Sequence, residues 1–486
     1  MKERAHTVIT TLLALVALGP LLAVNSESWD TTLVQFGFMT GDWSSIRPWL
    51  LDLGWYEPYY LYRLFAVINS LTGIPPKVFT NLLCVLSILG IAREVFLLLR
   101  SHHAVSREAA FVGAWVVLCF PIWHIFISSA VFINIVCLWL FLLAVRAWRF
   151  NKALAFLLFV LSLQLYSIFA FVIGFAVAEF LFTARRDNFM RTAVKTFLFC
   201  LGVLLLYFLF NLLVNLHGKD GTYNTINLQQ LDSLLQYVAT AAALMAAALF
   251  LKKKLPPDQA EHFTRSVAAA LALMLFAGLA YWAVGRPLRF FSFGSYSSRH
   301  AMLMCVPFAL LAAIAHDYAA RFIGRKRLAA FTACVLTALV VLLYQGYDHK
   351  IAAVIYKEML TREFAKTQAP PSGYVEITAD GHTPPKHIHQ YEVNMSLFQA
   401  YGKAAWMCNG FWESTRMLGL PALQKHYDMP QASRRLYIAS DVTGDAYSRY
   451  SFTVKGFHQE GRIWYWLYYA LGSYGAFEPR LSRIDS

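Results

Sequence analysis

Apolar runs of about 20 residues, the length that crosses a bilayer as an α-helix, follow one another along most of this chain. The pattern predicts a first span over 7–24, which we expect to be retained rather than cleaved as a signal peptide. Further spans are predicted at 77–99, 108–127, 130–147, 153–165, 166–184, 194–215, 232–251, 266–284, 301–320 and 328–345. A total of about eleven spans indicates a polytopic α-helical membrane protein.

One shorter apolar stretch, Tyr59–Leu71, has a different character. It is too short to cross a bilayer. It also carries a charged residue, Arg63, and ends at a Gly-Ile-Pro-Pro sequence. Its aromatic and polar residues are mixed, as in helices that lie along a membrane surface. We therefore expect a helix in the membrane interface rather than a further span.

After residue 345 the long apolar runs end. Polar residues and two Pro-Pro pairs become frequent, which is typical of a folded domain outside the membrane. Strands are predicted at Tyr374–Thr378, Leu436–Ala439 and Ser451–Val454, a helix at Met395–Leu418, and an aromatic segment at Trp464–Leu471 that lies on the membrane or docks against the spans. The chain is thus expected to divide into a transmembrane module, 1–345, and a small α+β domain, 346–486.

Composition and charge support a membrane protein. The 486 residues are 58% hydrophobic and only 14% charged, too little charge to coat a soluble domain. The net charge of +14 lies in short clusters, with no basic helix or motif typical of nucleic-acid binding, so we expect no nucleic-acid partner. The clusters occupy alternate connections: Arg93/Arg100/Arg107, Arg146/Arg149/Lys152, Arg185/Arg186/Arg191, Lys252/Lys253/Lys254 and Arg321/Arg325/Lys326/Arg327. The positive-inside rule places these connections and the N-terminus in the cytoplasm, and the C-terminal domain outside it.

The connection behind the first span, 25–76, falls on the outer side and begins with an acidic stretch. Over residues 25–62 its acids are Glu27, Asp30, Asp42, Asp52 and Glu57, against one base, Arg47. The same stretch carries tryptophans and tyrosines, which favour the level where apolar rings meet wet lipid headgroups. We interpret this acid-rich loop as the wall of an active site.

Glu27 and Asp30 are three residues apart and would share one face of a helix. A carboxylate at this place could be the general base that takes a proton from a hydroxyl. The alternative is helix capping, with Ser26 or Ser28 as the cap and the acids in the first turn. Residue types alone favour capping, because helix starts with Ser and Asp are common, whereas the position of these acids in the chain favours the catalytic interpretation.

A second outer connection, 285–300, is rich in arginine, glycine and serine. Arg286, Arg289 and Arg299 break the positive-inside rule, which indicates an anionic partner. Guanidinium groups match phosphate oxygens, and a Gly/Ser backbone permits close approach. The partner is either a bound phosphate or, alternatively, lipid headgroups and the acids of the first loop.

Other polar side chains are candidates for lining a cavity near these two loops. They are Asp42, Tyr59, Tyr60, Arg63, His124 and His300. His124 and Asn134 flank a tight outer turn at Ser128-Ser129, and a structural role is the alternative for both. In the C-terminal domain, Asp380 and its neighbouring histidines match no strong metal-binding spacing, so we expect no metal site.

These features together resemble the GT-C glycosyltransferases. The resemblance rests on a first span, an outer loop that opens with acids, Gly41-Asp42-Trp43, Pro58-Tyr59-Tyr60, an interfacial helix, and many spans before an outer C-terminal domain. More narrowly, the chain is similar to bacterial envelope enzymes that take sugars from polyprenyl phosphate. The resemblance implies that the catalytic base is the carboxylate just behind the first span, Asp30 or Glu27. Many members have a contiguous Asp-Glu pair here, from which this chain departs; Glu27 fits the family's spacing and Asp30, which we prefer, fits its sequence context.

The resemblance also implies a function and its partners. The expected reaction is transfer with inversion from a polyprenyl-phosphate sugar, whose phosphate is held by Arg286, Arg289 or Arg299, to a glycan, lipid or protein acceptor. No cofactor or metal is implied, and the location is a bacterial inner membrane with a periplasmic C-terminal domain. The alternatives are a flippase or transporter of lipid-linked glycans, for which the sequence lacks inverted halves, and a polysaccharide polymerase or ligase.

Overall fold

The computed structural model describes residues 2–26, 34–35, 38–39, 43, 56–101, 105–163, 167–184, 187–215, 231–283, 296–368, 374–378, 390–401, 407–408, 447–455, 457 and 465–484. Its α-helices are α1 (Lys2–Ala23), α4 (Tyr56–Thr72), α5 (Pro76–Ser101), α6 (Arg107–Leu118), α7 (Phe132–Ala147), α8 (Lys152–Ser162), α9 (Ser167–Thr183), α10 (Phe189–Asn215), α11 (Leu231–Lys252), α12 (Pro257–Ala283), α13 (Cys305–Ala319), α14 (Arg325–Ala365), α15 (Gln390–Tyr401) and α18 (Tyr465–Ala470). Short 3-10 helices are η1 (Pro121–Ile127), η2 (Ser129–Val131), η3 (Tyr296–Met304) and η4 (Tyr474–Phe477). The strands are β1 (Tyr374–Thr378), β2 (Met407–Cys408), β3 (Tyr447–Val454) and β4 (Pro479–Ile484).

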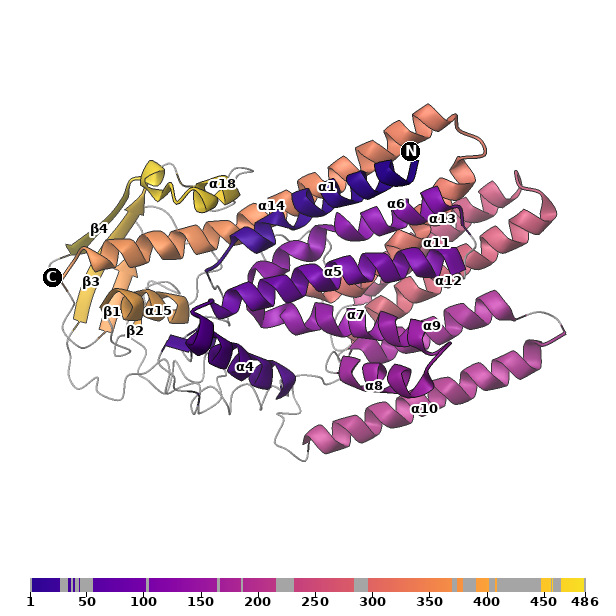
Figure 1. Cartoon of the computed structure of the whole chain (residues 1–486), viewed down its shortest axis with the longest axis horizontal. Helices are drawn as coiled ribbons and strands as arrows, with labels where there is room; N and C mark the ends of the chain where they lie inside the picture. Colours follow the sequence, from indigo (N-terminus) through magenta and orange to yellow (C-terminus); the bar gives the residue numbers. More distant parts are fainter. Residues whose placement is uncertain are drawn as a thin grey trace.

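Seven helical segments of the described part are long and apolar enough to cross a membrane, so the chain is a helical membrane protein. They are α1, α5, α6 with η1, α10, α12, the end of η3 with α13, and α14. Four shorter apolar helices, α7, α8, α9 and the apolar part of α11, coincide with the other predicted spans. Each predicted span therefore corresponds to a helix of one bundle (Figure 1), while the count of about eleven crossings stays a prediction.

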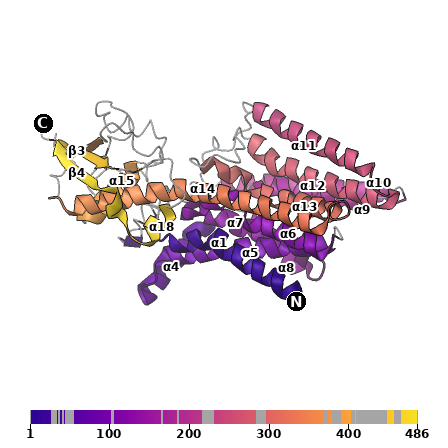
Figure 2. The ribbon, with the colours of Figure 1, turned by 90° about the horizontal axis from the view of Figure 1, so that it is seen from above.

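The basic connections between helices gather at one end of the bundle. Polar contacts join them: Arg146 with Glu94 (2.9 Å), Arg325 with Glu108 (2.5 Å), and Arg265 with the carbonyl of Ala184 (2.9 Å). These contacts link the ends of α5, α7 and α9 with the starts of α6, α12 and α14. We name this the basic end. The opposite end, towards which α14 and the strands extend (Figure 2), is the sheet end.

The predicted span that contains Pro121 is broken rather than continuous. Pro121 has no N–H and forces Phe120 out of helical conformation, to φ −63° and ψ 125°, so α6 ends at Leu118 and the chain continues as η1. The carbonyl of Val117, four residues before the proline, would have been the partner of the missing N–H. It accepts a hydrogen bond from Nε1 of Trp123 instead, at 2.6 Å.

A second proline, Pro20, lies inside α1 and leaves another carbonyl without its helical donor. That carbonyl belongs to Val16, four residues earlier. The hydroxyl of Tyr344 in α14 donates to it at 2.7 Å, and the hydroxyl of Tyr347 donates to the carbonyl of Ala17 at 2.9 Å. The irregularity of α1 is therefore what binds it to α14.

α14 is 41 residues long and continues well beyond the span predicted to end at 345. Its second half runs from the bundle to the strands (Figure 1). There Tyr356 packs edge-on against Phe452 of β3, and Phe364 packs edge-on against Tyr401 of α15. The boundary expected between transmembrane module and C-terminal domain thus lies within one continuous helix.

The four strands form one sheet in the order β2-β1-β3-β4. β1 pairs in parallel with β2 and β3, and β3 pairs antiparallel with β4. The predicted strands 374–378 and 451–454 are confirmed as β1 and the end of β3, whereas 436–439 lies outside the described residues. The predicted helix 395–418 is confirmed up to Tyr401 as part of α15, and it is wrong at 407–408, which pair with β1 as a strand because sheet contacts override the local helical pattern. Its other residues, 402–406 and 409–418, lie outside the described part of the chain.

The structure also describes two further predicted segments, one before α5 and one near the C-terminus. The helix predicted at 59–71 is confirmed as α4, whose apolar side chains Leu64, Val67 and Leu71 form an exposed stripe. The aromatic segment at 464–471 contains α18, which docks on α14 through the rings of Trp466 and Tyr344, 6.0 Å apart.

We expect Tyr344→Phe to destabilise the protein by about 0.6–2 kcal/mol, because the Val16 carbonyl would lose its donor within an apolar environment. In a Pro20→Ala background the same change should be nearly neutral, since the restored backbone N–H satisfies that carbonyl. Thermal unfolding of the detergent-solubilised variants measures both effects. An equal loss in the two backgrounds would contradict this account of the α1–α14 contact.

Candidate functional site

Polar and charged side chains are buried at the sheet end of the bundle. We name them the polar layer: Lys77, Thr80, Asn81, His124, Ser128, Ser129, His300, Asp348, Lys350 and Lys357. Burying ionisable groups at the depth of a membrane is unfavourable, so such groups usually mark a substrate or ion site. The polar layer is therefore the part of the described structure that we take as the candidate site.

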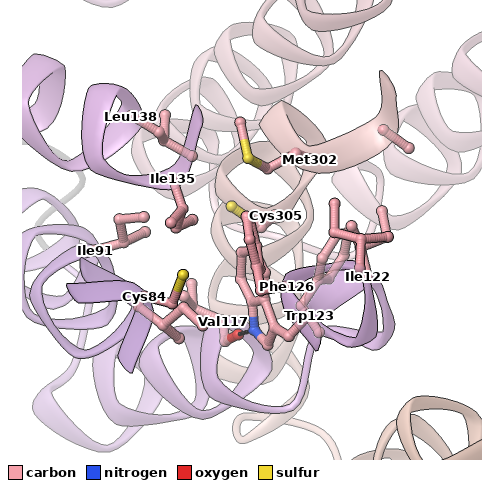
Figure 3. Packing of buried hydrophobic residues seen from close by; sticks show 14 of the residues in the cluster. Cys84, Ile91, Val117, Ile122, Trp123, Phe126, Ile135, Leu138, Met302 and Cys305 are labelled. Carbon is pink, nitrogen blue, oxygen red and sulfur yellow. Dashed lines mark hydrogen bonds between the residues drawn. The ribbon is translucent and has the colours of Figure 1, made fainter. Parts of the chain in front are cut away.

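An apolar core lies directly beside the polar layer. Figure 3 shows Trp123 and Phe126 of η1 packed among Cys84 of α5 and the sulfur-containing side chains of Met302 and Cys305. All of these side chains are fully or almost fully buried. Because this core excludes water, charges in the neighbouring layer are weakly screened and act strongly on a bound ligand.

Lys77 ties α5 to the break at Pro121. Its Nζ donates to the carbonyl of Ile127, the last residue of η1, at 2.5 Å, and to Oγ of Ser129 at 3.0 Å. The hydroxyl of Tyr62 in α4 donates to the Ser129 carbonyl at 3.0 Å. Thus Ser129 connects α4, α5 and the η1–η2 turn, and the buried ammonium of Lys77 stabilises this contact.

His124 is completely buried where η1 meets α14. Its Nδ1 lies 2.7 Å from the carbonyl of Pro121, and because a carbonyl can only accept, Nδ1 carries the proton of this bond. The ring lies against Gly346, where an added Cβ would come closer than 3.0 Å to Nδ1 and Cγ. Lys350 follows Gly346 by one helical turn. One nitrogen of His124 is thus used structurally, and its surroundings belong to the polar layer.

α14 also brings further ionisable groups into the polar layer. Lys350 and Lys357 are seven residues apart, two helical turns, and so share a face of α14. Their exposed fractions are only 3% and 1%. Asp348 is on another face, beside the backbone amides of Tyr465 and Trp466 at the start of α18. The sheet end therefore buries lysines and acids, among them Asp348, Glu363 and Glu392, next to its hydrogen-bonding groups.

α1 brings the start of the acid-rich loop to this layer. The carbonyl of Val24, just after the last residue of α1, accepts a hydrogen bond from Nδ2 of Asn81 at 2.9 Å. Both residues are buried. Glu27 and Asp30 follow Val24 by three and six positions in the sequence. The stretch that holds both candidate bases therefore begins at the polar layer.

Three of the predicted cavity residues surround Trp43 or lie near it. Tyr59 is buried with its ring edge-on to Trp43 at 6.4 Å, and the guanidinium of Arg63 lies 5.8 Å from the centre of the same indole. Tyr60, next to Tyr59, is 62% exposed. His300 is buried separately, with its ring 4.9 Å from that of Tyr281 at the end of α12.

The remaining predicted site residues are not described by the structure. Glu27, Asp30, Asp42, Arg286 and Arg289 lie outside the described residues, as do Asp380 and the histidines near it. Arg299 belongs to η3 by its backbone, and its side chain lies outside the description. Their predicted roles stay predictions.

Three lysines that the structure buries were not identified from the sequence: Lys77, Lys350 and Lys357. Each nevertheless has a sequence feature that could have indicated it. Lys77 follows Pro75-Pro76 at the start of a span that is predicted to lie on the outer side, where a base breaks the positive-inside rule as the arginine loop does. Lys350 and Lys357 have the seven-residue spacing of one helical face. That signal has meaning only once the helix is known to continue past 345.

No protein-family model matches this sequence, and no curated protein matches it. Within the described residues, no group of three or more His, Cys, Asp or Glu side chains could hold a metal ion. Interpretation of the function therefore depends on the sequence pattern and on the geometry of the sheet end.

We expect Gly346→Ala to lower the free energy of unfolding by about 1–3 kcal/mol, because the new methyl group would displace the His124 ring in a packed core. Gly202→Ala in α10 is the matched control: nothing lies within 4 Å of its added Cβ, so better helix propensity should leave stability equal or slightly higher. Thermal unfolding in detergent compares the two. Equal stability of both variants would show that the His124–Gly346 contact is not tight.

Proposed function

We propose that this protein is an inverting membrane glycosyltransferase that moves a sugar from a polyprenyl-phosphate donor to a glycan, lipid or protein of the cell envelope. The observation that carries the proposal is the buried polar layer at the sheet end, beside which the acid-rich loop begins. Such a reaction needs a carboxylate base and cations for a lipid phosphate at one membrane surface. The acids after Val24 and the bases of the sheet end are groups of these two kinds.

In the proposed reaction the donor enters from the bilayer, and Arg286, Arg289 or Arg299 binds its phosphate. Asp30, or Glu27 in its place, takes the proton of the acceptor hydroxyl. The hydroxyl oxygen bonds to the anomeric carbon while the bond from that carbon to the phosphate oxygen breaks, and polyprenyl phosphate leaves with the electron pair. Attack from the face opposite the leaving group inverts the anomeric centre. The protein contributes position and charge.

Lys350 and Lys357 support an anionic donor in particular. Both ammonium groups are buried on the half of α14 that lies at the sheet end. Charge buried in a medium of low dielectric is screened less than charge at the surface, so it attracts a phosphate over a longer distance.

The proposed orientation puts the basic end in the cytoplasm and the sheet end in the periplasm of a bacterial inner membrane. The exposed apolar stripe of α4 suits a membrane interface at the sheet end, on whichever side that end lies. The sheet with α15 and α18 then forms the extracytoplasmic α+β domain expected over 346–486. The catalytic groups would lie between this domain and the bilayer.

Asp30→Asn keeps the size of the side chain and removes the base, so we expect sugar transfer to fall by about 10²-fold or more with unchanged folding. Asparagine caps a helix as well as aspartate does, so the capping alternative predicts full activity. The assay offers the purified protein a panel of polyprenyl-phosphate monosaccharides and measures new glycosidic bonds. Glu27→Gln is measured beside it, and the variant with the greater loss identifies the base.

Near-normal transfer by both variants would contradict a catalytic role for this loop. Movement of the lipid-linked sugar across a vesicle membrane without a new glycosidic bond would instead support a flippase. Transfer only from longer lipid-linked glycans would support the polymerase or ligase alternative.

A further inference from the structure

The two residues before Glu27 are held by side chains from the far end of the chain. The backbone N–H groups of Asn25 and Ser26 both donate to the hydroxyl of Tyr469 in α18, at 3.2 and 3.0 Å. Oγ of Ser26 donates to Oε1 of Glu358 in α14 at 2.6 Å. These three bonds join positions more than 300 residues apart in the sequence.

The geometry at Tyr469 is restrictive. A phenol oxygen has few acceptor directions, and two successive N–H groups of the chain use them together. Two N–H groups that point at one oxygen fix the direction in which the backbone leaves α1. Because Ser26 is anchored a second time through its side chain, the chain enters the acid-rich loop from a defined place.

Tyr469 and Glu358 are themselves held in a packed cluster. The ring of Tyr474 lies 6.3 Å from that of Tyr469, and the guanidinium of Arg362 lies 4.3 Å from the centre of the Tyr474 ring. Burial, with Tyr469 and Glu358 close by, raises the pKa of Tyr474. The anchor is thus part of the contact between α14 and the C-terminal segment.

We propose that Tyr469 and Glu358 are positioning residues for the candidate catalytic loop, so that the C-terminal segment sets where the Glu27–Asp30 stretch begins. The inference rests on the proposed function. A general base must come within about 3 Å of the proton it removes, and a displacement of about 1 Å can reduce the rate by about 10²-fold. Glu27 is the next residue after the anchored Ser26, and Asp30 is four residues after it. Loss of the anchor should therefore lower kcat more than it changes the KM for the donor.

The first test measures the anchor without any substrate. Hydrogen–deuterium exchange of the full-length protein in detergent is followed in a peptide that covers Asn25 and Ser26. Tyr469→Phe removes only the accepting oxygen, so exchange there should become about 5-fold faster or more, while peptides of α5 are unchanged. Tyr468→Phe, which removes a neighbouring hydroxyl of α18, is the matched control and should leave exchange unchanged. Unchanged exchange in Tyr469→Phe would overturn the inference.

The second test measures transfer from the polyprenyl-phosphate sugar that the wild-type protein uses. Tyr469→Phe and Glu358→Ala should lower kcat by about 10-fold or more with KM for the donor within about twofold. Glu358→Gln keeps an acceptor for Ser26 and should retain most of the wild-type kcat. Faster exchange with unchanged kcat would overturn the inference and leave the proposed function intact. A wild-type protein that transfers no sugar from any such donor would overturn both.

Discussion

Backbone carbonyls that proline leaves without a helical donor are the constraint on which the arrangement of this bundle depends. In a bilayer no water can satisfy them, so the protein must provide donors. Trp123 donates a hydrogen bond to the carbonyl of Val117 at the break before η1, and Tyr344 donates one to the carbonyl of Val16 in α1. The first donor comes from the same stretch of chain, six residues further on, whereas the second requires α14 to approach α1 closely. The proline of α1 is therefore linked to the contact between α1 and α14.

α14 connects this constraint to the candidate site. Along one helix it carries the tyrosines that bind α1, the glycine that accepts the His124 ring, the buried lysines, and the glutamate that holds Ser26. Its continuation past the bundle then supports the sheet and α18. A helix with so many contacts has little freedom to shift, which suits the proposed reaction, because that reaction needs a lipid phosphate and a base at a fixed separation.

The bundle could be predicted from the sequence in large part because spans depend on local composition. The predicted spans coincide with helices, apart from the one at 108–127, which is broken at Pro121. The helix predicted at 59–71 and the strand predicted at 374–378 are also present. Features set by contacts between distant segments could not be predicted in this way. The charged residues after 345 suggest a polar tail, yet four of them, Asp348, Lys350, Lys357 and Glu363, are buried along α14. The strand at 407–408 exists through its pairing with β1. For the site, the sequence indicates the acid-rich loop, whereas the buried lysines and the Tyr469 anchor require the three-dimensional contacts.

In the proposed orientation, on which the proposed function depends, the polar layer and the C-terminal sheet face the outside of the cytoplasmic membrane, opposite the basic end. An alkaline-phosphatase reporter, which is active only outside the cytoplasm, tests this directly when it is fused at two places in the chain. A fusion after Gly373 should be active and one after Lys254 inactive, because five basic clusters favour the cytoplasm together. The opposite pattern would contradict the account, since it would place the acid-rich loop and the polar layer on the cytoplasmic side.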